Sequence, residues 1–314
     1  MAKRSPTSSG SQQQPKDNSA FTTPTPPVDV GEAISSLAPM ARTTVRLHPR
    51  QGNADLSASK IGGDILWPES EQWPTCAEHG CPYVPAIQLR KDDVPEIGFR
   101  RNTNLFQVLW CPNRHPDYFC PIVKVFWRNS DRIKKPLPHC PEPTTAERRY
   151  VPTPCVVHPE RVVEYPDGGE LSERDHELIE LSDTINNAVS DLGVEPIGNW
   201  SVPNGVGTYY AWLSVAPGTK VGGHPGWVQD PPQLRCTCNH PMEYLVSFSS
   251  HEFDGASWGR WLPLSERYVL SAEYHKLAQV QCPAGWSFGD AGSLYLFICR
   301  QCDDWPIHAF TQSC

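Results

Sequence analysis

The chain has 314 residues, of which 39% are hydrophobic, and it carries a formal net charge of −8 with a pI near 5.8. This length is enough for one large or two small domains with a real core, and the acidic charge disfavours a general affinity for nucleic acid phosphates. The 33 prolines, about twice the usual share, interrupt most segments that would otherwise form helices, so we expect short strands and long loops.

The N-terminal region begins with a polar segment, MAKRSPTSSGSQQQPKDNSAFTTPTPPVDV. Such a composition cannot bury enough apolar surface to offset the entropy of ordering, so we expect residues 1–40 to be a disordered tail. The early basic residues are not followed by an apolar stretch, and no run of 18 apolar residues occurs in the chain. The pattern is therefore not that of a secretory signal or a membrane span, and we expect a cytoplasmic protein without a membrane partner.

Two stretches of the chain are almost alike: SKIGGDILWP at 59–68 and TKVGGHPGWV at 219–228. In both copies a cysteine, Cys76 or Cys236, follows 16 residues after the lysine. Each copy then has a second cysteine, an apolar segment and an aromatic-rich strand that leads into another cysteine. We infer an internal duplication and predict a β-rich α+β fold built from two β-sheet repeats.

One segment between the copies is free of prolines and predicts a helix. In LSERDHELIELSDTINNAVSDLGV, at 171–194, Ser172 is suited to cap the start and Gly193 to end it. Apolar residues recur there at three- and four-residue steps: Leu178, Leu181, Ile185, Val189 and Leu192. This pattern predicts one amphipathic helix of about five turns. The expected layout is a tail at 1–40, a first repeat at 41–135, a Pro-rich linker and helix at 136–200, and a second repeat at 201–314.

The glycine pair in each copy has two interpretations. Two adjacent glycines permit a tight turn with positive φ where a strand enters a sheet, whereas a phosphate-binding loop needs more glycines followed by a helix. Pro68 and Pro225 lie close behind the two pairs and oppose such a helix. The structural turn is the favoured interpretation, with Lys60 and Lys220 as the reactive groups nearby.

The 12 cysteines indicate metal binding. Without a signal peptide they are expected to be thiols in a reducing compartment, and clustered thiols are typical of zinc sites. In the second copy two knuckles supply a closed tetrahedral set: Cys236, Cys238, Cys299 and Cys302. Buried free cysteines that pack as small hydrophobic residues are the alternative interpretation.

The first copy offers a matching set with an open choice of ligands. We expect one structural zinc ion at Cys76, Cys81, Cys111 and His115, with His79 or Cys120 as substitutes. The remaining cysteines have no partners at metal-binding spacing: Cys140, Cys155, Cys282 and Cys314. The chain is thus predicted to hold one or two zinc ions.

Six longer motifs carry a family resemblance: ARTTVRLHPR (41–50), KIGGDILWP (60–68), LFQVLWCPNRH (105–115), SVAPGTKVGGHPGWVQDP (214–231), EFDGASWGRWLP (252–263) and GDAGSLYLFICRQC (289–302). They resemble the YwqG-like family, a bacterial domain of unknown function, over about 41–310. That family is similar in turn to the programmed cell death protein 2 group, which carries a duplicated domain with cysteine knuckles. The resemblance implies a chaperone-like, adaptor or immunity role and carries over no catalytic residue.

Two hypotheses about function follow. The first is a non-enzymatic protein that binds a protein or a basic peptide in an acidic, aromatic groove between the repeats, with nucleic acid disfavoured by charge. The candidate groove comprises His251, Glu252, Asp254, Asp290, Trp258, Trp261, Lys60 and Lys220. The second is a hydrolase or RNA-processing enzyme that uses these carboxylates, or an accessory protein of a metabolic pathway. Acidic residues beside glycine are more often turn formers, and the chain has no G-x-S-x-G, H-E-x-x-H or glycine-rich nucleotide motif, so the binding hypothesis is favoured.

Overall fold

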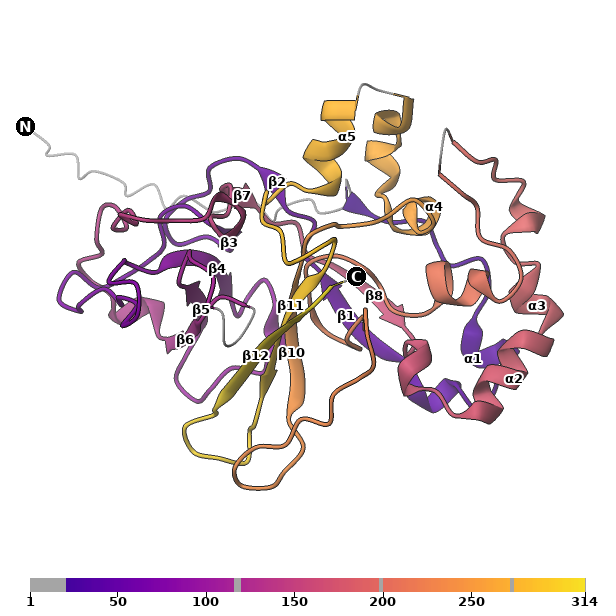
Figure 1. Ribbon diagram of the computed structural model, residues 1–314, viewed down its shortest axis with the longest axis horizontal. Helices are drawn as coiled ribbons and strands as arrows, with labels where there is room; N and C mark the ends of the chain where they lie inside the picture. Colours follow the sequence, from indigo (N-terminus) through magenta and orange to yellow (C-terminus); the bar gives the residue numbers. More distant parts are fainter. Residues whose placement is uncertain (1–20, 116–119, 198–199, 272–273, 314) are drawn as a thin grey trace, which may run out of the picture.

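The computed structural model describes residues 21–115, 120–197, 200–271 and 274–313, and two six-stranded antiparallel sheets form its body (Figure 1). Sheet A has, in spatial order, β12 (Ile307–Gln312), β11 (Ser293–Ile298), β10 (Glu243–Ser249), β9 (Lys220–Gly222), β1 (Arg42–Arg46) and β8 (Glu160–Glu164). Sheet B has β2 (Arg50–Gln51), β7 (Cys155–Val156), β3 (Lys60–Ile61), β4 (Val84–Arg90), β5 (Leu105–Trp110) and β6 (Val123–Arg128). The predicted β-rich α+β fold is confirmed.

The two sheets repeat one arrangement of four strands. In sheet B the order is β3-β4-β5-β6, and in sheet A it is β9-β10-β11-β12, with every neighbour antiparallel. Lys60 begins β3 and Lys220 begins β9. The second strand of each set has a shift in register near its start, between Pro85 and Ile87 in β4 and between Tyr244 and Val246 in β10. This agreement confirms the internal duplication.

Two extended segments pass from one sheet to the other. Residues 42–51 supply β1 to sheet A and β2 to sheet B, and residues 155–164 supply β7 to sheet B and β8 to sheet A. β1 pairs with β9 of the second repeat, while β7 pairs with β3 of the first repeat. Each set of four strands is therefore completed by both crossing segments.

The inner faces of the two sheets share one hydrophobic core. Trp110 of β5 lies at its centre, and its ring contacts Phe248, Trp286 and Phe288 of the second repeat at centroid distances of 5.3, 5.5 and 5.8 Å. Because side chains alternate along a strand, Val246 and Leu294 point into this core while Ser247 and Tyr295 face outward. The boundary between the sheets is thus filled by side chains, and clefts lie on their outer faces.

The helices lie mainly beside sheet A (Figure 1). They are α1 (Val30–Ala33), α2 (Glu173–Leu181), α3 (Asp183–Asn186), α4 (Trp258–Trp261), α5 (Tyr274–Gln281) and a π-helical turn at Tyr209–Leu213. Short 3-10 turns occupy Ala38–Met40, Pro95–Ile97, Ser130–Arg132, Arg148–Tyr150, Gly168–Glu170, Ser190–Leu192 and Leu264–Ser271. None of the helices in the described part of the chain is long and apolar enough to cross a membrane.

The predicted helix at 171–194 is broken into shorter pieces. Ser172 caps its start in a capping box with Asp175, as predicted, but α2 ends at Leu181. Ser182 has extended backbone angles, and its side chain accepts a hydrogen bond from the amide of Ile185, so it ends α2 and begins α3. A serine hydroxyl competes in this way with the continuing helix. Leu181, predicted to lie on the apolar face, is 80% exposed.

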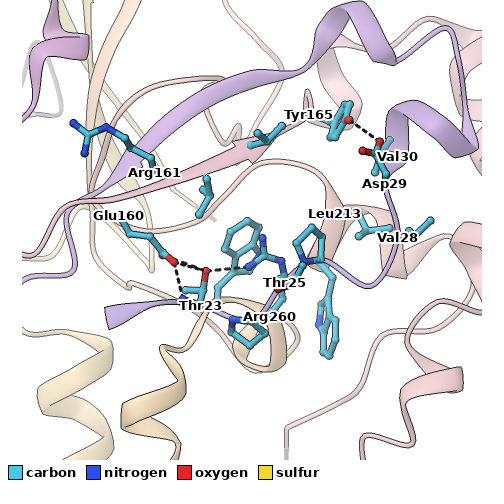
Figure 2. A pocket seen from close by; sticks show the side chains of 16 residues that line it. Thr23, Thr25, Val28, Asp29, Val30, Glu160, Arg161, Tyr165, Leu213 and Arg260 are labelled. Carbon is cyan, nitrogen blue, oxygen red and sulfur yellow. Dashed lines mark hydrogen bonds between the residues drawn. The ribbon is translucent and has the colours of Figure 1, made fainter. Parts of the chain in front are cut away.

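The N-terminal segment is packed from residue 21 onward, whereas the expectation for residues 1–20 lies outside the described residues. The backbone amide of Thr23 donates to Oε1 of Glu160 at 2.6 Å, and Arg260 Nη1 donates to the Thr23 hydroxyl at 3.1 Å (Figure 2). Val30 and Leu37 are buried in a small core with α2 and α3. Residues 21–40 are therefore part of the fold, because two buried polar anchors and a few apolar side chains offset their ordering entropy.

Candidate metal centres and binding cleft

A short turn before the second strand of each repeat carries the first two metal ligands. The turn before β4 is closed by a bridge between Thr75 and Pro82, and the turn before β10 by a bridge between Arg235 and Pro241. The backbone amide of the first cysteine donates across each turn at 2.9 Å, from Cys76 to the Cys81 carbonyl and from Cys236 to the His240 carbonyl. The other two ligands follow the third strand, β5 or β11. The four-ligand sets therefore occupy the same place in both repeats.

The second repeat gathers four thiols, as predicted. The ligand atoms of Cys236, Cys238, Cys299 and Cys302 lie within 4.8 Å of one another. The sulfur–sulfur distances are 3.7 Å between Cys236 and Cys302, 3.5 Å between Cys238 and Cys299, and 3.9 Å between Cys299 and Cys302. Cys238 is exposed to solvent, whereas Cys236 and Cys299 are buried. Hydrogen bonds from the backbone and ring of His240 lower the pKa of the Cys238 thiol to about 6.

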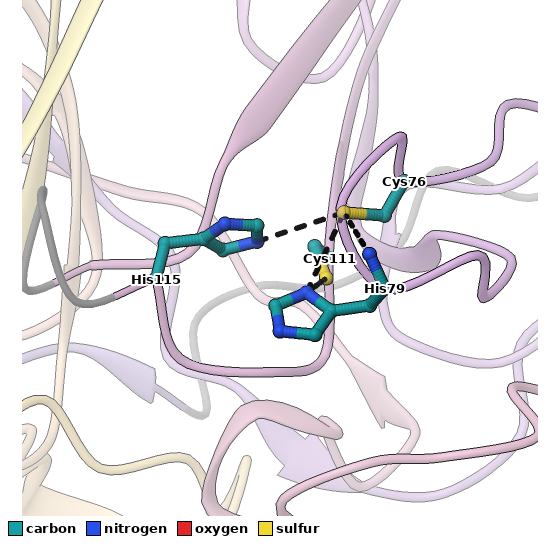
Figure 3. A group of neighbouring side chains, drawn as sticks. All are labelled: Cys76, His79, Cys111 and His115. Atoms are coloured by element: carbon teal, nitrogen blue, oxygen red, sulfur yellow. Dashed lines mark hydrogen bonds between the residues drawn. The ribbon is translucent and has the colours of Figure 1, made fainter.

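The first repeat gathers two thiols and two imidazoles. The ligand atoms of Cys76, His79, Cys111 and His115 lie within 4.8 Å of one another, as Figure 3 shows. Cys76 Sγ is 3.5 Å from His79 Nδ1 and 3.7 Å from His115 Nε2, and Cys111 Sγ is 3.4 Å from His79 Nδ1. Except for the half-buried His79, these side chains are buried.

These distances fit the edges of a tetrahedron around a metal ion. Bonds of about 2.3 Å from zinc to sulfur and about 2.0 Å from zinc to nitrogen imply sulfur–sulfur edges of about 3.8 Å and sulfur–nitrogen edges of about 3.5 Å. The measured separations span 3.5–3.9 Å and 3.4–3.7 Å respectively. A disulfide would bring two sulfurs to about 2 Å, and all cysteines in the described residues are free. Both clusters can therefore hold a metal ion.

Glu78 supports the first cluster from outside. Its Oε2 lies 2.8 Å from Nδ1 of His115, which leaves Nε2 of that ring directed toward the cluster. Its other oxygen lies 3.8 Å from Nε2 of His79. A carboxylate on the outer nitrogen of a ligating histidine fixes the tautomer and the ring orientation. Glu78 is not among the predicted site residues, although its place between a cysteine and a histidine in C-A-E-H offered a signal.

Cys81 lies beside the first cluster, while His79, one of the two predicted substitutes, belongs to the cluster. The Cys81 sulfur is 3.8 Å from that of Cys111 and accepts a hydrogen bond from Asn113 at 3.3 Å. Counted back from Pro82 and Pro241, His79 corresponds to Cys238 and Cys81 corresponds to His240, because the first turn is one residue longer. Cys120, the other possible substitute, packs in the main core, where burial raises the pKa of its thiol to about 11.

The two lysines of the repeated phrase are buried with different partners. Lys220 donates to both carboxylate oxygens of Glu164, at 2.8 and 2.7 Å. Lys60 donates to backbone carbonyls, at 3.3 Å to Ala54 and 2.6 Å to Asp64. Burial lowers the pKa of both ammonium groups. The glycine pairs form turns, as expected, and a Cβ on Gly223 would overlap the Glu164 carboxylate.

Several residues of the predicted groove are buried. Trp258 and Trp261 pack in a core with Phe253, and their indole nitrogens donate to the carbonyls of Ser201 and Ala211. The carboxylate of Glu252 accepts hydrogen bonds from the amide of Thr219, and burial raises the pKa of Glu252. These three predicted residues face the interior of the second repeat.

Other predicted residues meet at a cleft of 390 Å³ on the outer face of sheet A. Lys220, His251 and Asp254 line it, and the exposed Asp290 lies close enough to act on the charge of His251. Asp254 also accepts hydrogen bonds from the amides of Ala256 and Ser257, so it forms a turn as well. Burial lowers the pKa of His251, against the opposing effect of Asp254 and Asp290.

Other residues that line this cleft do not belong to the predicted groove. They are an acidic residue and aromatic side chains from separate segments: Asp167, Tyr210, Trp227 and Tyr295. Burial raises the pKa of Asp167. Lys220 also lines the cleft, but the Glu164 carboxylate already neutralises its charge. Among the described lining residues the cleft is therefore acidic and aromatic.

The comparisons with known proteins point to one family. The model of a family described as a domain of unknown function, DUF1963, matches residues 59–304, so the chain belongs to that family. The match includes both clusters and both lysines of the repeated phrase. A search of the curated proteins finds no match.

Proposed function

We propose that this DUF1963 protein is a non-enzymatic binding protein whose two sheets are each stabilised by a structural zinc ion. The tetrahedral spacing of the ligand atoms in both repeats supports the zinc sites of this proposal. Each cluster supplies four protein ligands, which is typical of structural zinc sites, whereas catalytic sites keep one position for water or substrate. The zinc ions would tie the turn before the second strand to the loop after the third.

The cleft on the outer face of sheet A supports binding of a basic polypeptide segment. Its carboxylates, Asp167 and Asp254, attract a cation, and Tyr210 and Trp227 offer aromatic faces to a guanidinium or an ammonium group. Its volume of 390 Å³ suits one long side chain with its neighbouring backbone. A protein partner with exposed lysine or arginine residues fits this chemistry best.

The family resemblance agrees with this role. The programmed cell death protein 2 group includes chaperones of a small-subunit ribosomal protein, and such a protein is rich in basic segments. The hydrolase or RNA-processing alternative would need a nucleophile or a general base directed into the cleft. His251, Asp167 and Asp254 line the cleft and have general-base chemistry. Asp254 is held in its turn by the amides of Ala256 and Ser257, which favours the binding role.

The test is to measure binding of a lysine- and arginine-rich peptide by fluorescence anisotropy. Replacing Asp167 and Asp254 together by asparagine keeps the side-chain shape and is expected to weaken binding by about tenfold, or about 1.4 kcal/mol. Asp92→Asn is the matched control, because Asp92 is 80% exposed on the other repeat. Equal binding by the double variant would contradict the cleft, and metal-dependent hydrolysis lost in that variant would favour the enzyme.

A further inference from the structure

The buried lysine that begins the first strand of each repeat, Lys60 or Lys220, binds a carboxylate in one of the two repeats. In sheet A the Glu164 carboxylate receives both hydrogen bonds from Lys220. It also accepts from the amide of Ala216 at 2.8 Å and from the amide of His224 at 2.5 Å. One ammonium group and two backbone amides thus form a carboxylate receptor, and Glu164 fills it from within the chain.

The first repeat has the receptor without the carboxylate. The strand pairs β9–β1–β8 place Val162 across from Gly222, two residues after Lys220, with Glu164 two residues further on. The strand pairs β3–β7–β2 continue to Gly52, whose amide donates to the Pro154 carbonyl at 3.0 Å. Gly52 therefore corresponds to Val162, and Ala54 corresponds to Glu164. A methyl group stands where the second repeat has a carboxylate side chain.

A cavity of 320 Å³ lies at this place. Its lining includes Ala54, Leu56, Lys60, Gly63 and Asp64. Lys60 is only 4% exposed, and within the described residues no carboxylate oxygen lies within ion-pair distance of its ammonium group. The amides of Leu56 and Asp64 correspond to those of Ala216 and His224, with a constant offset of 160 residues, and neither has a hydrogen-bond acceptor in the described part of the chain.

The acidic side chains nearby do not replace the missing carboxylate. The Asp64 carboxylate accepts from the amide of Cys140 at 2.7 Å and contacts Nδ1 of His139 at 2.9 Å, so each of its oxygens already has a partner other than Lys60. The Asp64 and Asp55 carboxylates both act on the Lys60 charge through space, Asp64 more strongly, but neither forms an ion pair with it. A buried ammonium group without an ion-pair partner is costly, and an anion of the right shape would offset that cost.

We propose that the cavity at Lys60 binds a carboxylate group from outside the chain, in the position that Glu164 occupies in the second repeat. The ligand is either a small carboxylic acid or a carboxylate of a partner protein, held by the Lys60 ammonium group and the amides of Leu56 and Asp64. This site lies in sheet B and does not depend on the proposed acidic cleft.

The first experiment titrates the protein with sodium acetate and sodium glutarate by calorimetry, against sodium chloride at matched ionic strength. Saturable binding of a carboxylate, absent with chloride, is the expected result. Ala54→Glu supplies the missing carboxylate from within the chain, so it should abolish that binding and raise the Tm above that of Ala54→Gln, its uncharged control. The proposal is overturned if neither carboxylate binds the wild-type chain, or if Ala54→Glu binds it unchanged.

The reciprocal experiment uses the second repeat. Glu164→Ala removes the internal carboxylate, and acetate should then restore part of the lost Tm in a saturable manner that chloride does not reproduce. A failure of that variant to fold in either salt leaves the Ala54→Glu result to decide. A further comparison distinguishes a partner protein from a small acid as the source of the carboxylate. A peptide with a free C-terminal carboxylate and its amidated form each compete with acetate for the wild-type chain. Competition by the free form alone indicates a protein partner, and no competition indicates a small acid.

Discussion

The two repeats share their strands but differ in how their polar sites are completed. The first repeat has a mainly buried cluster with two histidines, supported by Glu78, and a lysine whose hydrogen bonds within the described residues go to backbone carbonyls. The second has four thiols, one of them exposed, and a lysine paired with Glu164. One backbone arrangement therefore tolerates an exchange of ligand type as long as the ligand atoms keep their tetrahedral spacing.

The two repeats also differ in what their buried lysines do. In the second repeat the buried lysine, Lys220, is paired with a carboxylate of the chain itself, Glu164. Glu164 lies at the end of β8, and a long segment separates it from Lys220 along the chain. The first repeat connects Ala54 to Lys60 by a short loop and leaves a cavity. The lysine position that holds a structural ion pair in the second repeat thus lines a cavity in the first repeat.

The largest expected effect comes from removing metal. Cys299→Ser should lower the free energy of unfolding by at least about 3 kcal/mol, because structural zinc contributes about 10–16 kcal/mol to the folding of small zinc peptides. Metal analysis of the freshly purified, reduced wild-type protein should give two zinc ions per chain. A chain that carries no zinc and unfolds identically with and without chelator would contradict both sites.

The rate at which a chelator removes zinc should distinguish the two repeats. Cys238 is exposed whereas the Cys111 thiol is buried, so a chelator should remove zinc from the second repeat first and from the first repeat later. The Cys111→Ser variant should then lose the slow phase and Cys299→Ser the fast phase. Release of both ions in one phase, unaltered in the variants, would show that exposure does not control access.

The next effect concerns the two lysines. Lys220→Met leaves Glu164 buried without its ion pair and should cost about 3–5 kcal/mol of unfolding free energy. Lys60→Met removes two hydrogen bonds to carbonyls but no ion pair, and should cost less than about 2 kcal/mol. Urea denaturation of both variants measures the difference. Equal costs would mean that the paired carboxylate does not distinguish the two turns.

The smallest effect concerns Glu78. Glu78→Gln keeps the length of the side chain but weakens its hold on His115, and should lower the zinc affinity of the first site by about 10- to 100-fold. Competition with a chromophoric chelator measures this affinity. Glu69→Gln, an exposed glutamate of the same repeat, is the control. The second site has no such carboxylate among its described hydrogen bonds, so its affinity should not change in either variant.

Much of the fold could be predicted because the duplicated phrase fixes its own alignment. Lys60 and Lys220 stand at the starts of equivalent strands, and the four thiols of the second cluster follow from their spacing. His79 could not be selected over Cys81, because one extra residue in the first turn changes which side chain points toward the cluster. Spacing alone does not report that direction.

The remaining features depend on register and on distant segments. Ala54 and Glu164 lie in dissimilar sequences, and only the strand pairing shows that they occupy one position. Asp167 and Tyr210, which line the cleft, come from two separate segments without any motif. Trp261 is buried because it packs against residues far away in the chain. The sequence does not show this packing, and the prediction that Trp261 lies in an open groove is therefore wrong.

The crossing strands have a consequence for the synthesis of the chain. β1 is complete after residue 46, but its two neighbours are β8, at 160–164, and β9, at 220–222. At about 5–20 residues per second, a ribosome needs roughly 9–35 s to deliver the second neighbour. During that time a strand of threonine, valine and arginine has no native partner on that side. The N-terminal half therefore completes its structure late in translation, and pairings of such long sequence separation place refolding in the slow range of milliseconds to seconds.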